Sequence, residues 1–169
     1  MIDKKCKDVE WWTPEHVLAA ARETLGDQID LDPATHASNP TKARRFFTRD
    51  DDGLSSPWSA SLDVFVNPPY GKALMTWVLK IVQEARRAPG RKIVALLPGQ
   101  RFETAVWQEF LLPCPCLRYV VFVRGRLRFA TPSGKLAKSN PYGSMLYLFN
   151  CEPSRLMKAL GHVQEWRPR

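Results

Sequence analysis

The sequence predicts an α/β fold with a mostly parallel sheet that has an antiparallel end. Segments with apolar residues at helical spacing alternate with short, continuous apolar runs, which are typical of strands buried on both faces. Toward the C-terminus, three apolar runs follow one another without a helix between them, which favours antiparallel pairing. The 169 residues fit one domain, spanning 1–169, with no long insertion for a separate target-recognition domain.

The first predicted element is a helix that begins at Thr13-Pro14. Thr is a favourable N-cap residue, and Pro is favoured at the first helical position. Apolar side chains then repeat on one helical face until Gly26, a residue that commonly ends helices. A short strand is predicted over residues 28–31, whereas residues 41–47 fit no single pattern.

The middle of the chain alternates strands with helices. Residues 62–66 end in an apolar run and are predicted as a strand. Residues 73–88 carry apolar side chains at helical spacing and predict an amphipathic helix. The continuous apolar run at 93–97 predicts a strand buried on both faces, and residues 102–112 predict another helix.

The last part of the chain predicts the antiparallel end of the sheet. Residues 117–123, 126–130 and 144–150 are predicted as three strands, and residues 154–160 as a short closing helix. The strands are close enough in sequence to pair in an antiparallel manner.

The tetrapeptide Asn67-Pro68-Pro69-Tyr70 is the most informative motif in the chain. It follows the apolar run at 64–66, which is the layout of a buried strand that ends in a rigid turn. Proline has a fixed φ, and Pro69 restricts Pro68 to extended geometry. The backbone carbonyl of Pro68 is therefore held in place.

These residue types suit methyl transfer to a planar amine. Such an amine is a poor nucleophile, because its lone pair is delocalised into the attached ring or carbonyl. Two hydrogen-bond acceptors, the side-chain oxygen of Asn67 and the carbonyl of Pro68, favour the pyramidal form in which positive charge develops. The ring of Tyr70 can stack on the flat substrate. The alternative is an ordinary Asn-Pro-Pro turn with a packed tyrosine.

Two polar turns are expected at the same edge of the sheet. Ligands of parallel α/β sheets bind at the carboxyl ends of the strands, and Asp32-Pro33 and Asn67-Pro68 both follow predicted strands. One turn would serve a cofactor and the other the methyl acceptor. Asp30 is a second cofactor candidate. The alternative role of Asp32 is to cap its own turn.

Composition favours an anionic partner. The formal net charge is +8 at pH 7, which indicates nucleic acid first. No apolar run approaches the ~20 residues of a membrane span, and no signal peptide is evident. We therefore expect a soluble, cytoplasmic protein without membrane contact.

The four cysteines predict no metal site. Cys114-Pro115-Cys116 lacks the two-residue gap of a zinc knuckle, and no histidine lies near it. Reduced thiols are expected at these positions and at Cys6 and Cys151.

Several short pieces, taken together in their order and spacing, carry a family resemblance over roughly residues 11–149. The pieces are Trp12-Thr13-Pro14, Leu31-Asp32-Pro33-Ala34, Asp52-Gly53-Leu54 with Trp58, Val66-Asn67-Pro68-Pro69-Tyr70-Gly71, Leu96-Leu97-Pro98, Gly125-Arg126-Leu127 with Phe129, and Ser144-Met145-Leu146. On these pieces the sequence resembles the small phage- and prophage-borne, Dam-like DNA adenine methyltransferases. The resemblance implies a Rossmann-like methyltransferase fold of reduced size, S-adenosylmethionine as cofactor, and a phage or prophage protein acting in a bacterial cytoplasm.

The resemblance also implies roles for individual residues. The motif from Asn67 to Tyr70 would hold a flipped adenine, and Asn67 would also border the cofactor. The remaining cofactor residues would be Trp12, Thr13 and Pro14 over the methionine end, Asp32, Pro33 and Ala34 in the loop after the first strand, and Asp52 near the adenosine. The loop after the first strand departs from the wider methyltransferase pattern, because it contains no glycine.

A basic stretch is the candidate DNA-binding surface. Arg124, Arg126 and Arg128 are spaced by two, so in a strand they would project from one face and could contact phosphates. Lys135 and Lys138 extend this positive region. An ordinary solvated face is the alternative, and a second basic cluster comprises Arg44, Arg45 and Arg49.

The sequence therefore predicts a site-specific or non-specific adenine-specific DNA methyltransferase. The adenine must be flipped out of the duplex to reach the motif. Two alternatives stay open: methylation of another planar amine (cytosine, an RNA base or a protein glutamine), and a catalytically silent DNA-binding module on the same fold. The intact Asn67 and Tyr70 argue against the silent module.

Overall fold

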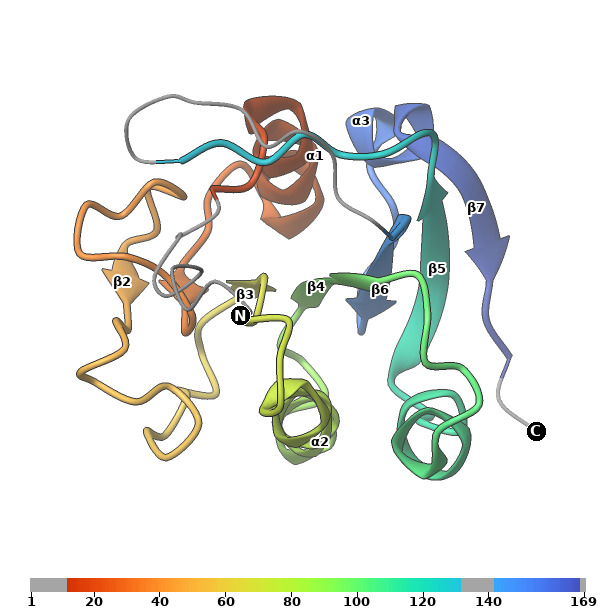
Figure 1. Cartoon of the computed structure of the whole chain (residues 1–169), viewed down its shortest axis with the longest axis horizontal. Coiled ribbons are helices and arrows are strands. Elements are labelled where there is room, and N and C mark those ends of the chain that lie inside the picture. Colours follow the sequence, from red (N-terminus) through yellow and green to blue (C-terminus); the bar gives the residue numbers. More distant parts are fainter. Residues whose placement is uncertain (1–11, 132–141, 168–169) are drawn as a thin grey trace, which may run out of the picture.

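Helices cover both faces of one central sheet in the computed structural model, which describes residues 12–131 and 142–167 (Figure 1). This three-layer arrangement confirms the predicted α/β class. The helices are α1 (Glu15–Leu25) and α3 (Arg155–Ala159) on one face, and α2 (Leu74–Arg87) and the π-helix η1 (Val106–Leu111) on the other.

The sheet has seven strands in the order β2-β1-β3-β4-β6-β5-β7. Their bounds are β1 (Leu31–Asp32), β2 (Arg45–Phe46), β3 (Val64–Val66), β4 (Ile93–Pro98), β5 (Leu117–Val123), β6 (Ser144–Phe149) and β7 (Gly161–Glu165). The pairs formed among β2, β1, β3 and β4 are parallel, whereas the pairs from β4 through β6 and β5 to β7 are antiparallel. Parallel and antiparallel pairs are thus equally frequent in the described sheet, so the prediction of a mostly parallel sheet is wrong.

The central strands are buried on both faces, as their apolar runs predict. All residues of β3 and β4 are buried. Phe65 and Val94 pack with α1 and α3, whereas their neighbours Val64 and Ala95 pack with α2 and η1. This division follows from the two-residue period of a strand, which sends successive side chains to opposite faces.

The start of α1 differs from the prediction. The N-cap residue is Pro14, and no side chain caps the helix. Thr13 is buried instead, with 9% of its surface exposed. The predicted end is confirmed, because Gly26 has a φ of 93°, in the left-handed region that favours glycine.

The predicted strand over 126–130 is also wrong. The chain turns at Gly125, which has a φ of 73°. It then runs as an extended segment that forms one isolated antiparallel bridge, between Ala130 and Trp12. Leu127 and Phe129 are buried against the layer that contains α1, so their apolar spacing reflects packing over a helix rather than sheet pairing.

Two other predicted elements differ in their bounds, and two strands are additional. The first strand is β1 at Leu31–Asp32 rather than 28–31, and the helix predicted over 102–112 is the shorter η1. The ambiguous segment 41–47 contains β2. The edge strand β7 was not predicted, because none of its residues is buried and it therefore lacks the apolar face that marks a strand in the sequence.

A buried ion-pair network joins α2 to the chain before β3. The guanidinium of Arg91 is fully buried and lies 2.7 Å from a carboxylate oxygen of Glu84. It also donates to the carbonyls of Trp58 and Ser59, at 3.2 Å and 3.1 Å. Lys80 and Arg87 contact the same carboxylate. The network therefore fixes the loop that ends at Trp58 against α2.

Two absences hold for the described residues. No helix among them is long and apolar enough to cross a membrane. The same residues contain no group of three or more histidine, cysteine or acidic side chains that could hold a metal ion. Cys114, Cys116 and Cys151 are free thiols, and Cys6 lies outside the described residues.

Candidate active site

The two polar turns lie at the same edge of the sheet. β1 and β3 are adjacent and parallel, with Leu31 opposite Val64. Asp32 ends β1, and Asn67 directly follows β3, so both lie at the carboxyl ends of neighbouring strands. The prediction that these two turns share one edge of the sheet is therefore confirmed.

The motif after β3 presents an aromatic ring beside a half-buried amide. Asn67 is partly buried and Pro68 is buried, whereas 39% of the surface of Tyr70 is exposed. The hydroxyl of Tyr70 points toward the carbonyl of Leu96, 3.5 Å away. Burial of this hydroxyl raises the pKa of Tyr70 well above its usual range, so the phenol stays neutral at physiological pH. The exposed part of the ring is available for stacking on a planar group.

The amide of Asn67 is anchored by the N-terminal segment. Its Nδ2 donates a hydrogen bond to Oγ1 of Thr13, 3.1 Å away and 54 residues earlier in the chain. Trp12, next to Thr13, pairs with Ala130 through two backbone hydrogen bonds of 2.7 Å and 3.1 Å. Three distant segments therefore meet beside the motif.

Asp32 is a buried carboxylate in the turn after β1. Only 2% of its surface is exposed, and burial raises its pKa to about 6. Its Oδ1 accepts a hydrogen bond from the backbone N–H of Ala34 at 3.0 Å. This bond and hydrogen bonds from the hydroxyls of Thr41 and Thr35 oppose the effect of burial, because each of them lowers the pKa. Asp32 therefore caps its own turn, which was the alternative reading of this residue, and its cofactor role stays a prediction.

Asp30 and Asp52 are occupied by local partners. The carboxylate of Asp30 accepts from the backbone N–H of Asp63 at 3.2 Å and lies 3.3 Å from Arg44. Asp52 accepts from the hydroxyl of Ser55 at 2.6 Å and from its own turn, and this hydroxyl is the main cause that lowers its pKa. Both roles toward a cofactor stay predictions.

Gly53 explains why the loop around Asp52 packs onto the loop of Asp32. A Cβ atom at Gly53 would lie 1.9 Å from the carbonyl oxygen of Pro33, so only glycine allows this approach. The carbonyl of Gly53 accepts from the indole N–H of Trp58 at 2.9 Å. Asp52-Gly53-Leu54 and Leu31-Asp32-Pro33-Ala34, two of the pieces that carry the family resemblance, are thus in direct contact.

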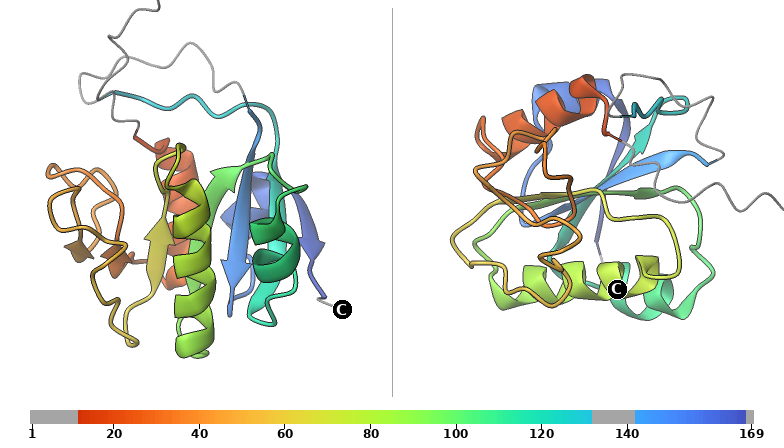
Figure 2. Two further views of the ribbon diagram at one scale, coloured as in Figure 1. Left: turned by 60° about the horizontal axis from the view of Figure 1, so that its bottom comes forward. Right: turned by 60° about the vertical axis from the view of Figure 1, so that its left-hand side comes forward.

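The three arginines of the basic stretch are exposed. Arg124, Arg126 and Arg128 flank the buried residues Leu127 and Phe129, although the segment is not a strand. This segment lies at the same end of the molecule as the starts of α1 and α2 (Figure 2, left). Lys135 and Lys138 lie outside the described residues.

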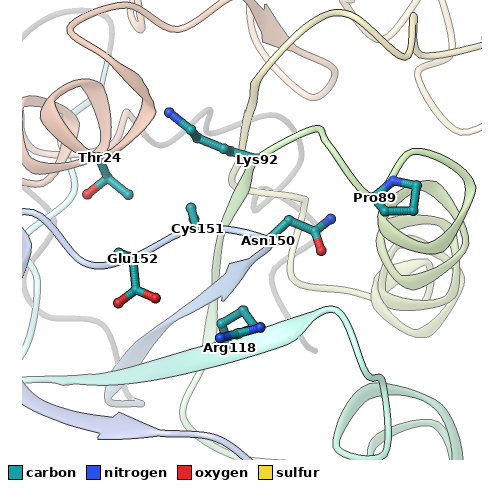
Figure 3. A pocket seen from close by; sticks show the side chains of 7 residues that line it. All are labelled: Thr24, Pro89, Lys92, Arg118, Asn150, Cys151 and Glu152. Carbon is teal, nitrogen blue, oxygen red and sulfur yellow. The ribbon is translucent and has the colours of Figure 1, made fainter.

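A cavity of about 500 Å³ lies at the opposite edge of the sheet (Figure 3). Lys92, just before β4, and Asn150, just after β6, both line it. Because the amino end of β4 is remote from the turn after β3, this cavity is separate from the candidate active site.

Two of the contacts that build the site have no signal in the sequence. The hydrogen bond between Thr13 and Asn67 joins residues 54 positions apart. The hydroxyl of the buried Thr41 reaches Asp32 from a segment whose structure the pattern left open. Neither contact follows from local periodicity.

One comparison with known proteins finds a match. The family model described as DNA N-6-adenine-methyltransferase (Dam) matches residues 2–163, nearly the whole chain. No curated protein matches the sequence.

Proposed function

Because the chain belongs to the DNA N-6-adenine-methyltransferase (Dam) family, we propose that it transfers a methyl group from S-adenosylmethionine to the exocyclic amine of adenine in DNA. The observation that supports this most directly is the turn after β3. It combines a half-buried amide at Asn67 with a partly exposed ring at Tyr70.

The chemistry of the turn fits an aromatic amine. The flipped adenine stacks on Tyr70, and its amine donates to Oδ1 of Asn67 and to the carbonyl of Pro68. These acceptors stabilise the positive charge that develops on nitrogen as it attacks. As the amine accepts the methyl group, Asn67 and Pro68 would hold it in place, and the methylated nitrogen would then release a proton to water.

The N-terminal segment offers a donor that suits the cofactor. The indole N–H of Trp12 is buried, and no residue within 12–131 and 142–167 accepts its hydrogen bond. A carboxylate, such as that of the methionine end of S-adenosylmethionine, is an acceptor for this donor. When bound, the cofactor supplies an electrophilic methyl group on a sulfonium. Trp12 and Pro14 would hold its methionine end, and Asp32, Pro33, Ala34 and Asp52 would border the rest.

The direct test measures methyl transfer from labelled S-adenosylmethionine to single- and double-stranded DNA, RNA and protein. Label recovered as N6-methyladenine from DNA supports the proposal. Label found only in cytosine, RNA or protein glutamine would show that the substrate is another planar amine rather than adenine in DNA. Binding of DNA without transfer to any substrate would indicate a catalytically silent module.

The Asp32→Asn variant is expected to be more stable than wild type at neutral pH but to bind the cofactor more weakly. The pKa of Asp32 is raised from 3.8 to about 6, so the folded state holds the extra proton between these values. Stability therefore falls as the pH rises through this window, and above it the buried charge costs on the order of 1–3 kcal/mol. Asparagine removes the charge and keeps the acceptor for Ala34.

Thermal unfolding at pH 7.5 and at pH 4 checks the stability of this variant, and calorimetric titration checks its affinity for S-adenosylmethionine. The gain in stability should shrink at pH 4, where the wild-type carboxyl is already protonated. Equal cofactor affinity in the variant and wild type would remove Asp32 from the cofactor site.

Replacing Arg124 or Arg128 with alanine is expected to weaken binding to all duplex sequences alike. Each phosphate contact that is lost lowers the slope of log affinity against log salt by about 0.9. Duplex binding across a salt series measures the slope. Arg86→Ala is the matched control, because Arg86 is exposed at the far end of α2.

Unchanged slopes for both variants would show that this stretch does not touch the DNA backbone. The cluster of Arg44, Arg45 and Arg49 would then be tested in the same way. Arg126 is treated separately, because it belongs to a piece of the family resemblance. If Arg126 shapes the rim of the active site, Arg126→Ala slows methyl transfer and leaves the salt slope intact.

A further inference from the structure

We infer that Thr13 is a positioning residue that holds the Asn67 amide in place beside the substrate amine. The inference rests on the proposed methyl transfer and adds to it a residue whose side chain acts through Asn67 rather than on the cofactor. Its basis is the hydrogen bond from Nδ2 of Asn67 to Oγ1 of Thr13.

An asparagine side chain has two ends of nearly equal size and opposite chemistry. Oδ1 only accepts hydrogen bonds, whereas Nδ2 only donates them. A substrate amine donates hydrogen bonds through its N–H groups, so it needs the acceptor Oδ1. If the amide turned by half a rotation, its NH₂ group would oppose the N–H bonds of the substrate and stabilise no developing charge.

In the structure, the amide has the orientation that this chemistry needs. Nδ2 lies 3.1 Å from Oγ1 of Thr13, so this end of the amide faces the N-terminal segment. Within residues 12–131 and 142–167, no donor reaches Oδ1 of Asn67. The oxygen therefore keeps its lone pairs for the substrate.

Thr13 is itself held from both sides. On one side, Trp12 is bridged to Ala130, and on the other, Pro14 is the N-cap residue of α1. Thr13 is buried, with 9% of the residue exposed, and threonine is stiff at χ1 because it is branched at Cβ. The hydroxyl is therefore fixed before substrate binds, as a group that orients a catalytic side chain must be.

The test compares Thr13→Val, which removes only the hydroxyl, with Thr13→Ser, which keeps it. Thr13→Val is expected to lower kcat for DNA methylation by about 10- to 100-fold, the range expected when a catalytic group is misplaced. KM for DNA and the calorimetric affinity for S-adenosylmethionine should stay within about twofold of wild type. Thr13→Ser should recover most of the lost kcat.

Thr24→Val is the matched control for loss of a buried threonine hydroxyl. Thr24 is also buried, and its hydroxyl donates to Ser154 at 3.0 Å, near the end of α1 that is remote from the motif. This variant is expected to lower thermal stability without lowering kcat. A comparable fall in kcat for both variants would show a general effect of destabilisation and overturn the inference.

Two further results would overturn it. The first is an unchanged kcat in Thr13→Val, and the second is weaker cofactor affinity with an unchanged kcat at saturating cofactor, which would make Thr13 a cofactor contact. The double variant adds a test of coupling: Thr13→Val should cost nothing further in the Asn67→Ala background.

Failure of the proposed function has a different outcome. Wild type would then transfer no methyl group to DNA. The contact can still be followed by NMR of the side-chain amide of Asn67, whose resonances should shift in Thr13→Val and stay near wild type in Thr24→Val.

Discussion

Asn67→Ala is expected to lower the rate of methyl transfer to DNA by about 10²- to 10³-fold. This is the usual effect of removing one preorganised hydrogen-bonding group that stabilises the charge developing in the transition state. The affinity for S-adenosylmethionine should largely survive. Alanine leaves the turn after β3 intact, because the fixed φ of Pro68 and Pro69 does not depend on the amide. Single-turnover kinetics with labelled cofactor measure the chemical step directly.

The matched control is Gln83→Ala, which removes a similar amide from the exposed side of α2. Its rate should equal that of wild type. If Asn67→Ala methylated DNA as fast as wild type, the motif would be an ordinary turn with a packed tyrosine. A variant that lost cofactor binding together with activity would instead assign Asn67 mainly to the cofactor.

Glu84→Ala is expected to lower the free energy of unfolding by about 3–5 kcal/mol, because it leaves the charge of Arg91 buried without an opposite charge beside it. The side chains of Arg91 and Glu84 are 0% and 5% exposed, and they lie 2.7 Å apart. Burial by itself would raise the pKa of Glu84, but hydrogen bonds from Arg91, Arg87 and Lys80 outweigh it, and the pKa is lowered. This stabilisation is present above the unfolded-state pKa and is lost as the pH falls through the folded one.

Chemical denaturation at neutral and acidic pH measures this effect. Glu109→Ala is the control, because Glu109 is exposed on η1 and should change stability by less than about 0.5 kcal/mol. The double variant Glu84→Leu with Arg91→Met should recover much of the loss, since the fully buried charge of Arg91 is removed together with its partner. If Glu84→Ala alone were as stable as wild type, the network would contribute nothing to holding Trp58 and its loop.

The fold class followed from the sequence because its signals are local. The runs of β3 and β4 are apolar at every position, a pattern typical of strands buried on both faces. Gly26 ended α1 as expected, because the left-handed conformation there favours glycine. The segment after Gly125 shows the limit of such reasoning. Its apolar alternation looks like a strand, but those side chains pack over a helix.

The motif from Asn67 to Tyr70, its place after a buried strand and the chemistry that its residue types suit can all be predicted from the residues alone. The fold was needed to show that Thr13 lies against Asn67, that Asp32 caps its own turn, and that Gly53 packs on Pro33. Strand burial and turn geometry depend on neighbouring residues, whereas these contacts depend on how distant segments pack together around one core.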